Sequence, residues 1–266
     1  MKRGQATIFI IIAAVVVFIV ILGFIFKDQL MTSVGLAESS KYPTEVQEVG
    51  EHVQDCVEYA TKSAVVAAGY QGNYFDPEEV VSFYDDNVVV PYYYYNGYDY
   101  LPSVEDWESE LSIYVEFLTL DCVDFSLFPE FELSAGDMDV ETSIGTEVEF
   151  EVEYPIDAAI GDNQYSIYDP FFDTIAVDLS NMHTIVTNMV ENEKTNPESV
   201  DLDFLLAQGL ASIEYVPYND GSYVYMLEDN TAFNGEEVYI FMFATYIPLP
   251  EEYDDLTGEE YMALLI

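Results

Sequence analysis

Positive charge is almost missing from this 266-residue chain. Six lysine and arginine side chains stand against 51 aspartates and glutamates, which gives a formal net charge of −45. Nucleic acids and anionic lipid surfaces are negative themselves, so we expect neither to bind the acidic part of the chain. Such a surface repels itself in dilute buffer, and molar salt, with a Debye length of about 3 Å, screens that repulsion. The balance favours adaptation to high salt, with cation binding or a basic partner protein as alternatives.

Histidine and cysteine are equally scarce, with two of each. A Ser-His-Asp or Cys-His nucleophile needs a histidine, and neither His52 nor His183 lies in a nucleophile motif. His52 and Cys56 together make only half of a zinc site. Residues 137–149 superficially resemble a calcium loop, but Thr142 stands where the turn glycine belongs. We therefore predict no enzyme, no catalytic residues, no cofactor and no metal site.

One long apolar run is present at the start of the chain. Residues 6–26 carry no charge, and as a helix they would span roughly 31 Å, the thickness of a bilayer core. Lys2 and Arg3 precede this run, which places the N-terminus in the cytoplasm. We predict a transmembrane signal anchor at 1–28, contacting lipid through 6–26, in a single-pass protein of the cell membrane. From Asp28 onward, 51 acidic residues face three lysines, so the predicted extracellular ectodomain has a formal charge of −48.

The first residues also resemble a known family. A short basic start, then Gly4-Gln5, then an unbroken apolar helix is similar to the archaeal class III, or prepilin-like, signal peptide. In that family a peptidase cuts between the glycine and the glutamine, which implies processing between Gly4 and Gln5. Many pilins carry glutamate at the fifth mature position, where this chain has Phe9. The alternative is an uncleaved signal anchor.

A weaker resemblance covers about the first third of the chain. The cysteine at 56 and the glycine-glutamine-glycine turn at 69–72 are similar to those of uncharacterised archaeal single-pass proteins. No known activity accompanies this resemblance.

The two cysteines, Cys56 and Cys122, both lie at apolar positions of predicted helices. An even number of cysteines outside the cell favours a disulfide. The bridge would close a loop of about 66 residues and contribute roughly 3–4 kcal/mol. Two buried free thiols are the alternative.

Hydrophobic periodicity predicts an α+β ectodomain of amphipathic helices and antiparallel strands. We expect a connector at 29–42, a helical part at 43–130 and an α+β part at 131–266. A capping box at Ser103 and Asp106 marks the start of the second helix, whose predicted buried stripe is Trp107, Leu111, Tyr114 and Leu118. The predicted helices cover 43–69, 103–122, 170–193 and 200–210, and the predicted strands lie within 140–154, 213–216, 222–228 and 237–246.

Tyrosine is unusually common, with 23 residues. Its ring offers a large contact area with a polar tip, which suits recognition surfaces as well as packing. A group of six flanks the predicted hairpin turn Asn96-Gly97. These candidates for an interaction surface, with core packing as the alternative, are Tyr92, Tyr93, Tyr94, Tyr95, Tyr98 and Tyr100.

Together these features predict a non-enzymatic, membrane-anchored surface protein. It would act as a pilin-like or cell-surface interaction subunit, through self-association or a protein partner. The alternative is a membrane-tethered accessory or solute-binding module of an envelope complex.

Overall fold

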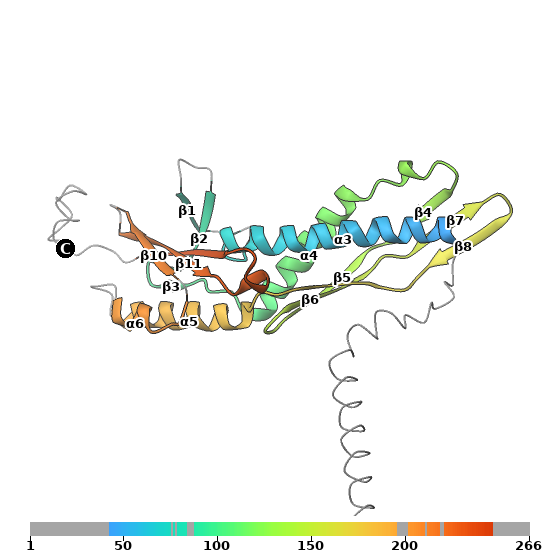
Figure 1. Ribbon diagram of the computed structural model, residues 1–266. Coiled ribbons are helices and arrows are strands. Elements are labelled where there is room, and N and C mark those ends of the chain that lie inside the picture. Colours follow the sequence, from blue (N-terminus) through green and yellow to red (C-terminus); the bar gives the residue numbers. More distant parts are fainter. Residues whose placement is uncertain are drawn as a thin grey trace, which may run out of the picture. The chain divides into compact units, whose positions relative to one another are not determined.

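The computed structural model describes residues 43–246, apart from 76, 78, 84–87, 196–201, 211, 219 and 220 (Figure 1). The predicted anchor at 1–28, the Gly4–Gln5 processing site and the connector at 29–42 lie outside the described residues. No helix in the described part of the chain is long and apolar enough to cross a membrane. The described residues from Glu48 onward cluster as one unit.

Two of the predicted helices are confirmed nearly residue for residue. The helices are α3 (Thr44–Tyr70), α4 (Val104–Cys122), α5 (Leu179–Thr195) and α6 (Leu202–Leu206), with short 3₁₀ turns η1 (Phe125–Leu127) and η2 (Ala232–Gly235). The predicted capping box is present before α4: the Ser103 hydroxyl accepts the Asp106 N–H, and the Asp106 carboxylate accepts the Ser103 N–H. This box satisfies two N–H groups that would otherwise lack a partner.

The predicted helix at 170–193 is wrong over its first turns. Residues Phe171–Ile175 form strand β9, which pairs with β6 (Val148–Glu153), and α5 begins only at Leu179. Phe171 is buried and Phe172 is exposed, as alternation on a strand requires. The spacing of the apolar residues fits a helix as well as a strand, and pairing with β6 decides between them.

The strands of the described residues form three sheets. The six-stranded sheet has the order β1-β2-β12-β11-β10, with β3 also paired to β2, and the three-stranded sheets have the orders β4-β7-β8 and β5-β6-β9. Every pair is antiparallel except β2 with β12. The remaining strands are β1 (Val80–Phe83), β2 (Val88–Tyr95), β3 (Tyr98–Asp99), β4 (Glu132–Ala135), β5 (Asp139–Ile144), β7 (Ile156–Ile160), β8 (Asn163–Ile167), β10 (Ser212–Pro217), β11 (Ser222–Asp229) and β12 (Tyr239–Tyr246).

The predicted helical part at 43–130 and α+β part at 131–266 share a sheet. Strand β2 belongs to the first part and β12 to the second, and the two pair in parallel at Tyr92 and Ala244. Two parallel strands need a long crossover connection between them. Local sequence patterns therefore cannot indicate that β2 and β12 pair.

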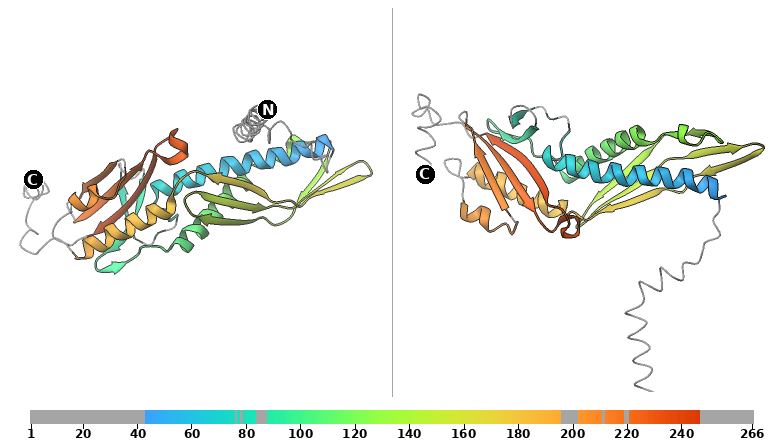
Figure 2. Two further views of the ribbon diagram at one scale, coloured as in Figure 1. Left: turned by 60° about the horizontal axis from the view of Figure 1, so that its bottom comes forward. Right: turned by 45° about the horizontal axis from the view of Figure 1, so that its top comes forward.

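Helix α3 contacts all three sheets in turn (Figure 2). Gly50 faces the Ile167 side chain of β8, the Thr61 hydroxyl donates to the Asp173 carboxylate of β9, and Gly69 lies against Ile240 of β12. The Cys56–Cys122 disulfide is present, with a Cα–Cα distance of 5.6 Å, and ties α3 to the end of α4. The α+β fold and the disulfide predicted from the sequence are thus confirmed.

Large aromatic side chains fill the core beside the six-stranded sheet. Tyr93 stacks on Phe243 with ring centroids 5.3 Å apart, and Tyr225 stacks on the same ring at 5.1 Å. Trp107 packs on Phe241 at 5.1 Å. All five rings are fully buried, so α4 is anchored to the sheet through its only tryptophan.

Gly69 allows the closest approach of α3 to the sheet. A Cβ atom at this position would lie 2.2 Å from the Ile240 carbonyl oxygen. We expect Gly69→Ala to lower the free energy of unfolding by about 2 kcal/mol or more, because the helix must move away from β12. Gly50→Ala is the matched control, since its Cβ would meet only Ile167 Cδ1 at 3.7 Å. Urea unfolding followed by Trp107 fluorescence measures both, and equal stability of the two variants would contradict the close approach.

Candidate functional site

The tyrosine-rich segment forms the predicted hairpin between β2 and β3. Asn96 and Gly97 have φ values of 50° and 88°, the positive values that a tight two-residue hairpin turn requires. The six candidate tyrosines then separate by burial. Tyr92 and Tyr93 lie in the core, where they cannot contact a partner of the folded protein; Tyr94, Tyr95 and Tyr100 are half-buried; Tyr98 is 66% exposed.

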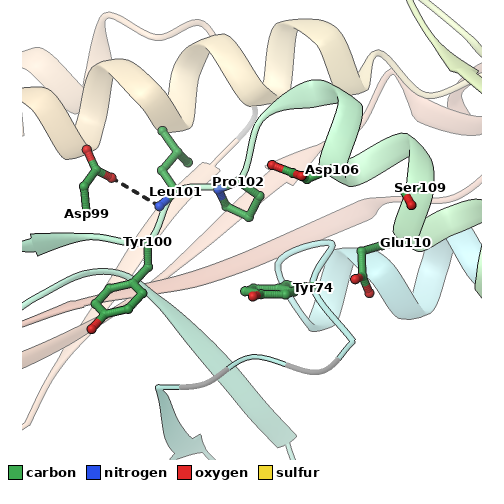
Figure 3. Close-up of a pocket in the computed structure, with 8 residues that line it drawn as sticks. All are labelled: Tyr74, Asp99, Tyr100, Leu101, Pro102, Asp106, Ser109 and Glu110. Atoms are coloured by element: carbon green, nitrogen blue, oxygen red, sulfur yellow. Dashed lines mark hydrogen bonds between the residues drawn. The ribbon is translucent and has the colours of Figure 1, made fainter.

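A pocket of about 410 Å³ opens where this hairpin meets the start of α4 (Figure 3). In Figure 3 the Tyr74 ring lies between Tyr100 and the Glu110 side chain. We call this the tyrosine pocket, and its lining is Tyr74, Asp99, Tyr100, Leu101, Pro102, Asp106, Ser109 and Glu110.

Backbone and histidine contacts hold the wall of the tyrosine pocket in place. The Tyr100 N–H donates to the Tyr93 carbonyl at 3.0 Å, and the Leu101 N–H donates to Asp99 Oδ1 at 3.2 Å. His183 Nε2 donates to the Pro102 carbonyl at 2.9 Å. These contacts tie the 99–102 loop to β2 and to α5, so the pocket is built on regular elements.

The carboxylates of the tyrosine pocket differ in their partners. Asp99 pairs with Lys194 of α5. Hydrogen bonds from the Ser103 backbone and hydroxyl lower the pKa of Asp106 below its usual value, so this side chain is ionised at neutral pH. Glu110 accepts the Phe75 N–H at 3.2 Å. The pocket therefore combines two aromatic rings with negative charge, which suits a ligand that carries a cation or several donor groups.

The outward face of α4 carries three large apolar side chains. Ile113, Phe117 and Leu120 are 62%, 61% and 48% exposed. Their spacing places them on one face of the helix, in line with Asp106 and Ser109 of the tyrosine pocket. We call these three residues the α4 stripe. Large apolar side chains gathered on one face of an acidic surface are typical of an interaction site.

The buried side of α4 differs by one position from the prediction. Trp107 and Leu111 are buried as expected, followed by Val115 and Thr119 in place of Tyr114 and Leu118, which are half-buried. Tyr114 instead stacks on Phe75 with ring centroids 4.2 Å apart.

Both histidines have structural partners. His52 Nε2 accepts the Asp124 N–H at 3.3 Å, and its ring lies 5.7 Å from that of Phe128. The His183 ring meets Trp107 edge-on at 4.9 Å. The Asp137–Glu149 segment forms the end of a loop and the β5–β6 hairpin. Among the described residues, no group of three or more histidine, cysteine, aspartate or glutamate side chains is placed to hold a metal ion.

Sequence reasoning did not single out Tyr74, Glu110 or the α4 stripe. The stripe has a sequence signal, since Ile113, Phe117 and Leu120 recur at helical spacing opposite Trp107 and Leu111. No pattern in the sequence indicates Tyr74 and Glu110, because only the turn after α3 brings these two residues together.

The chain was compared with known proteins. No family model, no curated protein and no solved structure matches this chain.

Proposed function

We propose that the protein is a non-enzymatic, membrane-anchored surface subunit, pilin-like or of the cell-surface interaction type, whose ectodomain binds another protein. The observation that carries this proposal is the α4 stripe. Covering these solvent-exposed apolar side chains with a partner is favourable by about 25 cal/mol per Å² of apolar surface removed from water. The helix that bears it is fixed on the opposite side by Trp107 and at its end by Cys122.

The sequence supplies the second support. The predicted membrane helix at 6–26 would hold the ectodomain at the cell surface, where the α4 stripe could meet a neighbouring protein. The acidic surface keeps the domain soluble in salt and repels nucleic acid.

A membrane-tethered accessory or solute-binding module is the second candidate function. The tyrosine pocket favours it, because aromatic rings and a few convergent polar groups are typical of ligand sites. This role would not require the α4 stripe to be covered.

The proposed function predicts the location of the protein and its assembly with other chains. We expect to recover it from membranes or from sheared surface material. Intact mass and N-terminal sequencing should show a chain that begins at Gln5 if a prepilin-type peptidase acts. On native gels after mild detergent extraction, the wild type should run as part of a larger complex. The double variant Ile113→Ser, Phe117→Ser should run as a single chain, because the apolar contact is lost.

The matched control for this double variant is Tyr59→Ser, which alters an exposed large side chain of α3. It should leave the complex unchanged. A wild-type protein recovered without any membrane or surface association, or migrating as a single chain, would refute the proposed function.

A further inference from the structure

We propose that the outward face of α4 is the docking surface for a segment of a partner protein in which apolar side chains adjoin a lysine or arginine. The apolar side chains cover the α4 stripe, and the cationic group enters the tyrosine pocket. This inference rests on the proposed function and adds the chemistry of the partner.

Continuity of the two features along α4 supports a single occupant. Asp106, Ser109 and Glu110 line the tyrosine pocket, and Ile113 follows one turn later on the same helix face. A segment that lies along α4 can therefore meet both features at once.

Charge complementarity selects a cationic group for the tyrosine pocket. Asp106 is ionised, and the surrounding ectodomain is strongly acidic. The Tyr74 and Tyr100 rings offer faces on which an ammonium or guanidinium group can rest. The protein uses this pairing elsewhere: Lys194 Nζ lies 5.7 Å from the centre of the Tyr94 ring.

A second copy of this chain fits the surface less well than a different protein. Its described residues include two cations, Lys62 and Lys194, and both are already paired with carboxylates. A copy would also bring its own acidic side chains to the contact, and like charges that face each other weaken an interface. The partner is therefore a protein with more lysine and arginine than this chain.

Site-specific photo-crosslinking in native membranes tests this inference. The full-length protein carries p-benzoylphenylalanine in place of Phe117, and the cross-linked peptides are sequenced after irradiation. We expect a cross-link to a different protein, within a few residues of a lysine or arginine. Glu110→Gln should lower its yield roughly tenfold, since a charge-assisted contact is lost while the amide oxygen can still accept the Phe75 N–H.

A second variant and a small-molecule competitor distinguish loss of the charged contact from loss of folding. Ser109→Lys, on an exposed position of α4, places a cation of the chain itself at the tyrosine pocket and should lower the yield as well. Excess argininamide should compete with the partner, and citrulline amide, which has no charge, should not. Glu147→Gln, an exposed carboxylate in the β5–β6 turn, is the matched control and should change nothing.

Three results would overturn the inference: cross-links only to lipid or to a second copy, a yield that Glu110→Gln and Ser109→Lys both leave unchanged, or equal competition by the two amides. A cross-link to a second copy would still agree with the proposed function, which fails if the protein has no membrane or surface association or migrates as a single chain.

Discussion

Removing the Cys56–Cys122 disulfide should lower the free energy of unfolding by about 3–4 kcal/mol, as expected for a bridge that closes a loop of 66 residues. In the unfolded chain the bridge restricts every residue between the two cysteines, and this restriction is lost in the double variant Cys56→Ala, Cys122→Ala. The bridge also fixes the end of α4 to α3. Without it we expect the α4 stripe and the tyrosine pocket to lose their fixed places on the domain.

Urea unfolding in molar KCl measures this loss, with the buried Trp107 as the fluorescent probe. The salt screens repulsion between surface carboxylates, so the difference reports the bridge. Adding a reductant should destabilise the wild type and leave the double variant unchanged, which is the internal control. A double variant within 1 kcal/mol of the wild type would contradict the expected role of the bridge.

A buried carboxyl group, Glu193 of α5, should make stability fall as pH rises. Burial is the main cause that raises its pKa to about 7, and the nearby Thr245 and Tyr225 hydroxyls act in the opposite direction. The Tyr225 hydroxyl donates to Glu193 Oε1 in the core beside the six-stranded sheet. A charge at this position would be poorly solvated, so the folded protein favours the neutral acid.

The sign of the pH effect follows from proton linkage. Between pH 4.5, the usual pKa of glutamate, and pH 7, the folded state keeps the Glu193 proton and the unfolded state has released it. Stability therefore falls as pH rises through this window, and the contribution present below pH 4.5 is gone above pH 7. A shift of this size corresponds to about 3 kcal/mol.

Glu193→Gln isolates this contribution, because the amide can still accept the Tyr225 hydroxyl but cannot ionise. We expect wild type and variant to have similar stability near pH 4.5, and the variant to be more stable by about 3 kcal/mol at pH 8. Urea unfolding at both pH values in molar KCl gives the comparison. Glu147→Gln removes an exposed carboxylate and should follow the wild type at both pH values. A Glu193→Gln variant that loses as much stability as the wild type would show that surface repulsion causes the pH dependence.

Local patterns were enough to predict several parts of the fold. The capping box at Ser103 and Asp106 fixed the start of α4, because its two hydrogen bonds involve neighbours in the chain. The Asn96-Gly97 turn predicted the β2–β3 hairpin for the same reason. The disulfide followed from cysteine number and the expected location outside the cell.

Other parts depend on contacts between distant residues. The apolar spacing at 170–175 fits a helix, yet pairing with β6 makes this segment a strand. Strand β2 is not among the predicted strands, and one of its partners, β12, lies more than 140 residues later in the chain.

The sequence by itself determined the strongly acidic character of this protein, the two cysteines that can pair, and the helices and hairpins whose signals are local. The tertiary structure decided which tyrosines are buried and which line a pocket: Tyr92 lies in the core and Tyr100 lines the tyrosine pocket, although both belong to one tyrosine-rich segment. It also decided that Tyr74, Glu110 and the α4 stripe share one side of the domain. Packing of α3 and α4 against the sheets sets these distances, and no short stretch of sequence records them.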